Sequence, residues 1–527
     1  MKNMIRSMLV AASALLVAAA CTDPTVAPKS SVSSANIFSE ETSYKSFLAK
    51  IYAGLAVSGQ QGPAGNGDIS GLDEGFSQYM RLWWQMEELP TDEAAVSWND
   101  GPIQELNTQI WSSSNSFLGS MYYRIYFQVA MANEFLRETT PEKLASRNVS
   151  AATRAEVAKF RAEARFLRAY SYFHGISLFG PIPLVKETDV IGKTPPQPAT
   201  RAQLFDYVVS ELNAIRTELP AMGAAEYGRV DQGAVSMLLA KMYLNAGVYT
   251  GTPKWAEALS EASKVIAGPY RLDANFRRMF SADNNTSPEI IFAIQQDGDK
   301  IQTWGGMTFL IHASVGASIN AGDYGIDGGW WGIRTKPSLA ALYPNNGGAS
   351  SPDKRSSFFT TTGFSGSMTN LTDYTTGIGS PKFTNKTSSG ASGKNSTFVD
   401  TDFPVFRLAD AYLMYAEAHL RGGGGSRATA LGYINALRDR AYGNPSGQIA
   451  DAQLTTAFIL DERARELFWE GTRRTDLIRY GQFSTAGIWQ WKGNTVNGKL
   501  TEAFRDLYPL PASELTANPN LKQNPGY

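Results

Sequence analysis

The sequence predicts a mostly α-helical protein in which tetratricopeptide-like helix pairs form a right-handed superhelical scaffold. Three observations lead to this prediction. Apolar residues recur at three- and four-residue steps in several segments, small residues alternate with aromatic ones along the paired segments, and residues 285–400 lack helical periodicity. We therefore expect a helical-repeat scaffold that is interrupted by a loop-rich, partly β insertion.

The first helix pair is expected at residues 154–179 and 201–219. Residues 154–179 carry apolar side chains on two faces, which include Phe160 on one and Phe173 on the other. A helix that is apolar on two faces packs between neighbours. Gly180-Pro181 directly follows this segment and is expected to end the helix.

The same unit recurs further along the chain. Because one helix pair cannot cover its own apolar face, stacked pairs are needed to bury a continuous core. The further pairs are expected at residues 231–247 with 254–267 and at residues 408–421 with 428–440, and another helix is expected at residues 456–480.

Residues 285–400 form the insertion. They begin with a predicted strand at residues 289–294 and are then rich in Gly, Ser, Thr and Asn. A segment of this length without regular structure is usually functional or disordered, and its many aromatic residues argue against disorder. We therefore expect the insertion to bear a ligand site.

The N-terminus has the pattern of a secretory signal peptide over residues 1–20, with Lys2 and Arg6 before a short apolar run. The run is shorter than the ~20 residues that span a bilayer, and an N-terminal membrane anchor is the alternative. The stretch that ends in Cys21, the only cysteine, resembles a bacterial lipoprotein signal, although Ala18 stands where such signals usually have Leu. Acylation of Cys21 would explain a lone thiol that has no disulfide partner. Residues 21–35 then form a lipidated, flexible tether.

The overall charge excludes one class of partner. The chain has 48 basic and 49 acidic residues, and phosphate binding needs a basic face. We expect no nucleic acid as a partner.

The three histidines are far apart and lack ligand spacing, and Asp297-Gly298-Asp299 lacks the later residues of a calcium loop. We therefore expect no metal and no cofactor.

The charged residues of 461–476 recur at helical spacing, which favours ion pairs over acid–base catalysis. A glycosidase needs two carboxylates about 5–10 Å apart, and the sequence alone does not place any two carboxylates at that distance. The sequence has no nucleophile elbow and no phosphate-binding loop. We expect no catalytic residues, with a glycoside hydrolase as the less favoured alternative.

Two aromatic clusters are the candidates for recognition of a sugar. Sugar rings pack their C–H faces on indole, and Asp, Asn and Arg can each engage two adjacent hydroxyls. The first cluster spans residues 71–101 and the second spans Trp304 and residues 323–334, both in sequence that reads as loop. The alternative for each tryptophan is a place in the core. The candidate ligand-binding residues are Asp73, Arg81, Trp98, Asn99, Asp100, Trp304, Tyr324, Trp330 and Trp331.

Several ordered motifs resemble the SusD/RagB family of outer-membrane nutrient-binding lipoproteins. The motifs are DFPVFRLADAYLMYAEAHL at 402–420, DERARELFWEGTRRTDLIRYG at 461–481, YPLPASELTANPNLKQNPGY at 508–527, FRAEARFLRAYSYF and FGPIPLV within 160–185, and GGWWGIRTKPSLAALY near the centre. The resemblance covers nearly all of the chain after the leader. It implies one SusD-like domain over residues 36–527, with the scaffold at 36–284 and 401–481, the insertion at 285–400 and a C-terminal tail at 482–527.

The resemblance also implies a role. Members sit lipid-anchored on the outside of the outer membrane, capture a glycan or sometimes a peptide, and pass it to a SusC-like TonB-dependent transporter. Members with an α-glucan ligand use an aromatic arc from the two clusters, which makes Trp98, Asn99, Tyr324 and Trp330 the leading candidates. We therefore expect a non-catalytic surface protein that binds an oligosaccharide, with a starch-like α-glucan as the expected ligand. The alternative from another class is a helical-repeat adaptor that binds only protein or peptide.

Overall fold

The computed structural model describes residues 37–38, 40–63, 65–190, 192, 194–356, 358–360 and 363–527. The predicted signal peptide, Cys21 and the tether lie outside the described residues. The chain divides into two compact units, one before Lys45 and one from Lys45 to Tyr527. The second unit holds the helix pairs, the insertion and the tail. Across the described residues, no helix is both long enough and apolar enough to cross a membrane.

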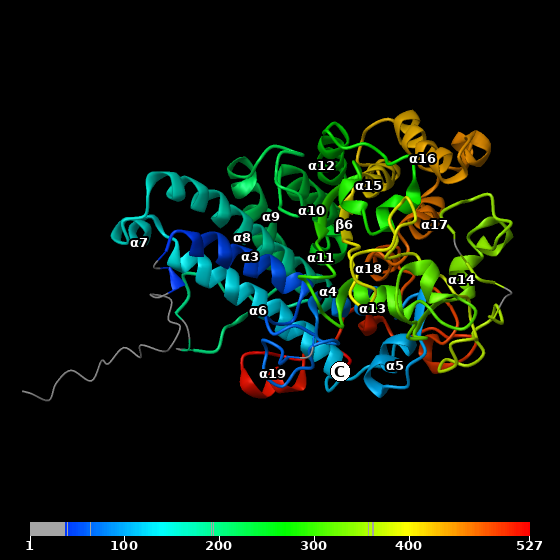
Figure 1. The fold of residues 1–527 in the computed structure, drawn as a ribbon, viewed down its shortest axis with the longest axis horizontal. Helices are drawn as coiled ribbons and strands as arrows, with labels where there is room; N and C mark the ends of the chain where they lie inside the picture. The colour runs from blue at the N-terminus through cyan, green and yellow to red at the C-terminus, as the bar shows by residue number, and fades with distance from the viewer. Residues whose placement is uncertain are drawn as a thin grey trace, which may run out of the picture. The chain divides into compact units, whose positions relative to one another are not determined.

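The predicted tetratricopeptide-like helix pairs are confirmed. Each long helix packs against the next, and Figure 1 shows them following one another from cyan through green to orange. The contacts run from α6 (Ser116–Glu138) to α8 (Ala151–Leu178), from α8 to α9 (Arg201–Ile215), from α10 (Gln232–Leu244) to α12 (Trp255–Ile266), from α12 to α15 (Leu408–Leu420), and from α15 to both α16 (Arg427–Tyr442) and α17 (Thr456–Leu467).

Short polar side chains begin several of these helices. Asn115, Ser150 and Asp231 each accept backbone N–H groups in the first turn of α6, α8 and α10. Thr200 and Gln203 form a reciprocal capping box at the start of α9. The remaining α-helices of the described residues are α3 (Thr42–Ala56), α4 (Tyr79–Glu88), α5 (Gly101–Thr108), α7 (Pro141–Ser146), α11 (Ala246–Thr250), α13 (Gly306–Ala313), α14 (Pro337–Ala340), α18 (Arg473–Arg479) and α19 (Ala512–Ala517).

The strands form three antiparallel two-stranded sheets. The strand predicted at the start of the insertion is confirmed as β4 (Ile290–Ile294), which pairs with β6 (Phe403–Arg407) just before α15. The other pairs are β1 (Ala94–Val96) with β5 (Ile333–Thr335), and β2 (Ile182–Pro183) with β3 (Pro198–Ala199). The β1–β5 ribbon joins the first aromatic cluster to the second.

The single helix predicted at 456–480 is wrong, because α17 ends at Leu467 and α18 begins at Arg473. Trp469 and Gly471 adopt left-handed backbone conformations, with φ of 61° and 71°. Groups far away in the sequence stabilise this turn. Glu88 accepts the N–H of Gly471 at 2.7 Å, and Lys382 Nζ donates to the carbonyl of Phe468 at 2.6 Å.

A buried ion-pair network joins the insertion to the scaffold, and Glu466 on α17 lies at its centre. Glu466 accepts hydrogen bonds from Arg407 at 2.7 Å, from Arg355 at 3.0 Å and from Arg440 on α16. Burial favours the neutral form of Glu466, but the three guanidinium groups outweigh it and hold the pKa of this carboxyl well below its usual range. The network therefore fixes Arg355 of the insertion against α17, and Arg440 joins α16 to the same network.

A second buried pair lies at the start of the β1–β5 ribbon. Glu88 and Glu93 are within hydrogen-bonding reach of each other and both are fully buried. Burial, together with the neighbouring carboxyl, raises the pKa of Glu88, and burial raises the pKa of Glu93 to about 8, even though Arg473 lies nearby. At neutral pH the pair therefore retains a proton that the unfolded chain has lost.

We expect Glu466→Ala to lower the free energy of unfolding by about 3–5 kcal/mol, because it leaves three buried arginines without their shared acceptor. Urea unfolding followed by circular dichroism measures this change. The control is Glu257→Ala, which removes an exposed partner of Lys254 and should change the free energy by less than about 0.5 kcal/mol. Equal effects of the two substitutions would contradict the central position of Glu466.

We expect Glu93→Gln to change the pH dependence of stability. The raised pKa of Glu93 stabilises the folded protein fully below the unfolded value near 4.5, and this contribution is lost as pH rises through about 8. The glutamine side chain keeps a hydrogen-bond donor for Glu88 but does not titrate. The melting temperature of the variant relative to wild type should therefore rise between pH 5 and pH 9. A difference that stays constant over this range would refute the assignment.

Candidate functional site

The unit from Lys45 to Tyr527 contains an open groove of about 1230 Å³. One wall is the segment that precedes α4, and the other sides come from the loop between β1 and α5, from α6 and from Trp304. Five of the predicted candidates line this groove, namely Asp73, Arg81, Trp98, Asp100 and Trp304. The structure thus brings the two aromatic clusters together at one surface.

The β1–β5 ribbon places Trp98 beside Trp330. Val96 pairs with Ile333, so Trp98 follows β1 at the same end of the ribbon at which Trp330 precedes β5. Trp98 Nε1 donates to the carbonyl of Trp330 at 3.0 Å. Gly332 leaves room for the Trp98 indole, because a Cβ at this position would lie 2.8 Å from the ring. The orientation of Trp98 is therefore fixed by the opposite strand.

Trp304 presents its indole to solvent, with 38% of the residue exposed. Its ring lies 6.1 Å from that of Trp330 and 4.9 Å from that of Phe398. Trp330 is half-buried and stacks on His312 at 4.8 Å. The rings of Trp304, Trp330 and His312 therefore form one aromatic cluster, and the Trp98 indole is joined to it through the Trp330 carbonyl.

Arg81 lies on α4 and is buried, although its sequence reads as loop. The sequence misleads here because the groups that fix Arg81 are distant along the chain. Its guanidinium lies 4.1 Å from the ring centroid of Phe309 and 5.8 Å from that of Trp98. Nη1 donates to the carbonyl of Trp304 at 3.3 Å. Burial lowers the pKa of Arg81 to about 10, so the side chain stays cationic at neutral pH.

The remaining four predicted residues, Asn99, Tyr324, Trp330 and Trp331, do not line the groove. Asn99 is exposed beside it, and Trp331 turns away from it to lie 5.8 Å from the ring of Tyr374. Trp331 is 49% exposed and has a φ of 54°. Tyr324 is half-buried next to Asn385, and burial raises its pKa to about 12. Ligand binding stays a prediction for all nine candidate residues.

Several groove residues were missed from the sequence. Phe117 comes from α6, and Asp68 and Glu74 belong to the wall before α4. Phe309 does not line the groove but lies under Arg81. The concentration of glycine between residues 59 and 75 is a signal that could have drawn attention to this wall. Phe117 and Phe309 have no such signal. Phe117 lies in α6, and Phe309 lies in α13, a short helix inside the insertion, which was expected to lack helical periodicity.

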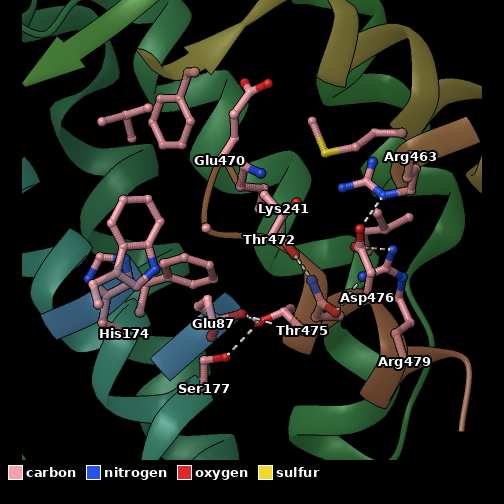
Figure 2. A pocket seen from close by; sticks show the side chains of 18 of the residues that line it. Glu87, His174, Ser177, Lys241, Arg463, Glu470, Thr472, Thr475, Asp476 and Arg479 are labelled. Atoms are coloured by element: carbon pink, nitrogen blue, oxygen red, sulfur yellow. Dashed lines mark hydrogen bonds and ion pairs between the residues drawn. The ribbon is translucent and has the colours of Figure 1, made fainter. Parts of the chain in front are cut away.

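A second cavity contains many titratable groups but has a volume of only about 30 Å³. Figure 2 shows Glu87, His174, Asp476 and Arg479 around it. Glu87 accepts from the N–H of Thr475 at 3.0 Å, and Asp476 pairs with Arg479 at 2.7 Å. Burial lowers the pKa of His174 to about 3, which leaves it neutral. The cavity has room for about one water molecule and is too small for a sugar.

Comparisons with known proteins agree with this architecture. A family model described as the SusD family matches residues 360–527, and one described as starch-binding associating with outer membrane matches residues 73–244. The starch-binding protein SusD of Bacteroides thetaiotaomicron is 34% identical over 91% of each chain. SusD-like protein P2 of Formosa agariphila is 25% identical over 81% of this chain and 84% of its own.

Solved structures with the same fold include proteins described as glycan-binding. A SusD-like carbohydrate-binding protein from Bacteroides fragilis superposes with a TM-score of 0.71 at 20% identity, and the alignment covers 92% of this chain and 99% of the other. Surface glycan-binding protein A from Bacteroides thetaiotaomicron, in complex with laminarihexaose, superposes with a TM-score of 0.66 at 20% identity, over 91% and 98% of the two chains.

Proposed function

The chain belongs to the SusD family, and on that premise we propose that it binds an oligosaccharide in the groove at Trp98 and Trp304 without cleaving it. The observation that carries the proposal is that Trp98 of the first aromatic cluster and Trp304 of the second line the same open groove. Indoles at the groove offer flat apolar faces to sugar C–H groups, while Arg81, Asp73 and Asp100 offer paired donors and acceptors for hydroxyls.

We further propose a starch-like α-glucan as the ligand. Support comes from the starch-binding relative, which is 34% identical over most of both chains. The groove is lined by four carboxyl groups, those of Asp68, Asp73, Glu74 and Asp100, and by one guanidinium, that of Arg81. This excess of acidic groups disfavours an anionic polymer and is compatible with a neutral one.

The cellular role that we propose is delivery. The protein is anchored at the outer face of the outer membrane through acylated Cys21, and it passes captured glycan to a SusC-like TonB-dependent transporter. The family model described as associating with outer membrane supports this role. Metabolic labelling with palmitate tests the anchor, since Cys21→Ser should remove the label and release the protein from the membrane fraction.

We expect Trp98→Ala and Trp304→Ala each to weaken binding of maltoheptaose by about tenfold, which corresponds to about 1.4 kcal/mol, because each removes one stacking face. Isothermal titration calorimetry measures the affinity. The matched control is Trp255→Ala, a half-buried tryptophan on α12 that does not line the groove. Wild-type affinity in both groove variants would overturn this site.

We expect no new reducing ends when the wild-type protein is incubated with maltoheptaose under conditions where it binds the sugar. Four carboxyl groups line the groove, namely those of Asp68, Asp73, Glu74 and Asp100, so the assay is a direct test of a hydrolase. Products that disappear in an Asp73→Asn or Asp100→Asn variant would contradict the non-catalytic proposal.

A further inference from the structure

The wall of the groove, which we define as residues 65–76, contains neither helix nor strand. Four of its residues are glycine, and glycine loses more conformational freedom on ordering than any other residue. The wall nevertheless carries polar groups that line the groove, including Asp68, Asp73 and Glu74. Something outside the wall must therefore hold it in place before a ligand can benefit from it.

The guanidinium of Arg124 contacts residues 58–77, the segment that contains the wall, at both ends and in the middle. Arg124 on α6 donates from Nε to the carbonyl of Ser77 at 2.6 Å and from Nη2 to the carbonyl of Ser58 at 3.4 Å. Its Nη1 forms an ion pair with Asp68 at 2.5 Å. Ser58 and Ser77 lie on either side of the wall, and Asp68 lies within it.

Arg124 is well suited to this position. Its side chain is only 1% exposed, and it extends from a long helix that packs against α8. The planar guanidinium presents five donors in a fixed fork, whereas a lysine ammonium cannot reach three segments at once. The Asp68 side chain is 21% exposed at the groove, so the ion pair joins the buried helix to the surface of the wall.

The end of the wall is joined to Trp304. The carbonyl of Glu74 accepts a hydrogen bond from Ser58 Oγ at 2.6 Å, and its carboxylate accepts the N–H of Trp304 at 3.4 Å. Gly75 lies so close that a Cβ there would be 2.8 Å from Cβ of Trp304. A shift of the wall would therefore also move the exposed indole of Trp304.

We propose that Arg124 is a positioning residue for the groove. Its guanidinium binds Ser58, Asp68 and Ser77 together, an arrangement that we call the clasp, and so holds the glycine-rich wall in its binding conformation. Arg124 does not line the groove itself, so it acts through the wall and not by touching the ligand. A wall that is ordered in advance spares the ligand the entropy loss of ordering it. The effect on affinity rests on the proposed function, whereas the clasp itself does not.

The experiment compares Arg124→Lys and Asp68→Asn with wild type in the full chain. Hydrogen–deuterium exchange of the free protein reports on the clasp without any glycan. We expect peptides that cover residues 57–78 to exchange at least tenfold faster in both variants, while peptides from α8, α15 and α17 keep their wild-type rates. Asp68→Glu, which keeps the carboxylate, should restore part of the protection.

Affinity for maltoheptaose, measured by calorimetry, reports on positioning. We expect Arg124→Lys to weaken binding by about fivefold or more. The control is Arg137→Lys on the same helix, which alters a half-exposed pair with Glu134 and should leave exchange and affinity unchanged. The melting temperatures of all variants show whether a loss of affinity results from global unfolding. Asp68→Asn is expected to fold, because the Asp68 side chain is partly exposed.

Each outcome decides one claim. Unchanged exchange at residues 57–78 in both variants overturns the clasp. Faster exchange with wild-type affinity overturns the positioning role. If wild-type protein binds neither maltoheptaose nor laminarihexaose, the proposed function fails, and the exchange rates still support or refute the clasp. Faster exchange together with weaker binding in Arg124→Lys, at an unchanged melting temperature, supports the whole proposal.

Discussion

The carboxylate of Glu466 accepts hydrogen bonds from three buried arginines that belong to different parts of the chain. Arg355 comes from the insertion, Arg407 from the end of β6 and Arg440 from α16. The described residues of the insertion form no large sheet and no long helix, so contacts of this kind hold the insertion on the scaffold. An isolated buried pair adds little net stability, but each member of a network becomes indispensable once its partners are buried. The same insertion carries Trp304 and Trp330, and Trp330 lies beside Trp98.

The β1–β5 ribbon connects the scaffold to the groove. At one end, Glu88 and Glu93 contact the turn between α17 and α18. At the other end, the ribbon leads directly into Trp98 and Trp330. Because side chains alternate along a strand, a shift of one residue would turn each side chain to the opposite face. The buried groups at the scaffold end therefore set the register that brings the two indoles together.

The repeat scaffold could be predicted from the sequence because its signals are local. Apolar periodicity located α8, α10, α12, α15 and α16, and a β-rich run located β4. The break between α17 and α18 could not be predicted in this way, since its left-handed turn is held by Glu88 and Lys382, which are remote in sequence. The same reason explains Arg81, whose partners are Trp304 and Phe309. Composition identified the aromatic clusters, but whether an indole faces the groove, as Trp98 does, or turns away, as Trp331 does, depends on backbone geometry at Gly332 and at Trp331 itself.

Arginine recurs wherever irregular backbone has to be held near the groove. Arg81 supports the carbonyl of Trp304 while its planar cation lies against Phe309, and Arg124 gathers three segments of the opposite wall. Backbone without helix or strand leaves carbonyl groups that need donors, and one guanidinium supplies several donors in a fixed plane. The wall of residues 65–76 has neither helix nor strand, so hydrogen bonds along the backbone of the wall do not hold it in place. Its position depends instead on the buried charge of Arg124, which contacts it at Asp68 and on either side.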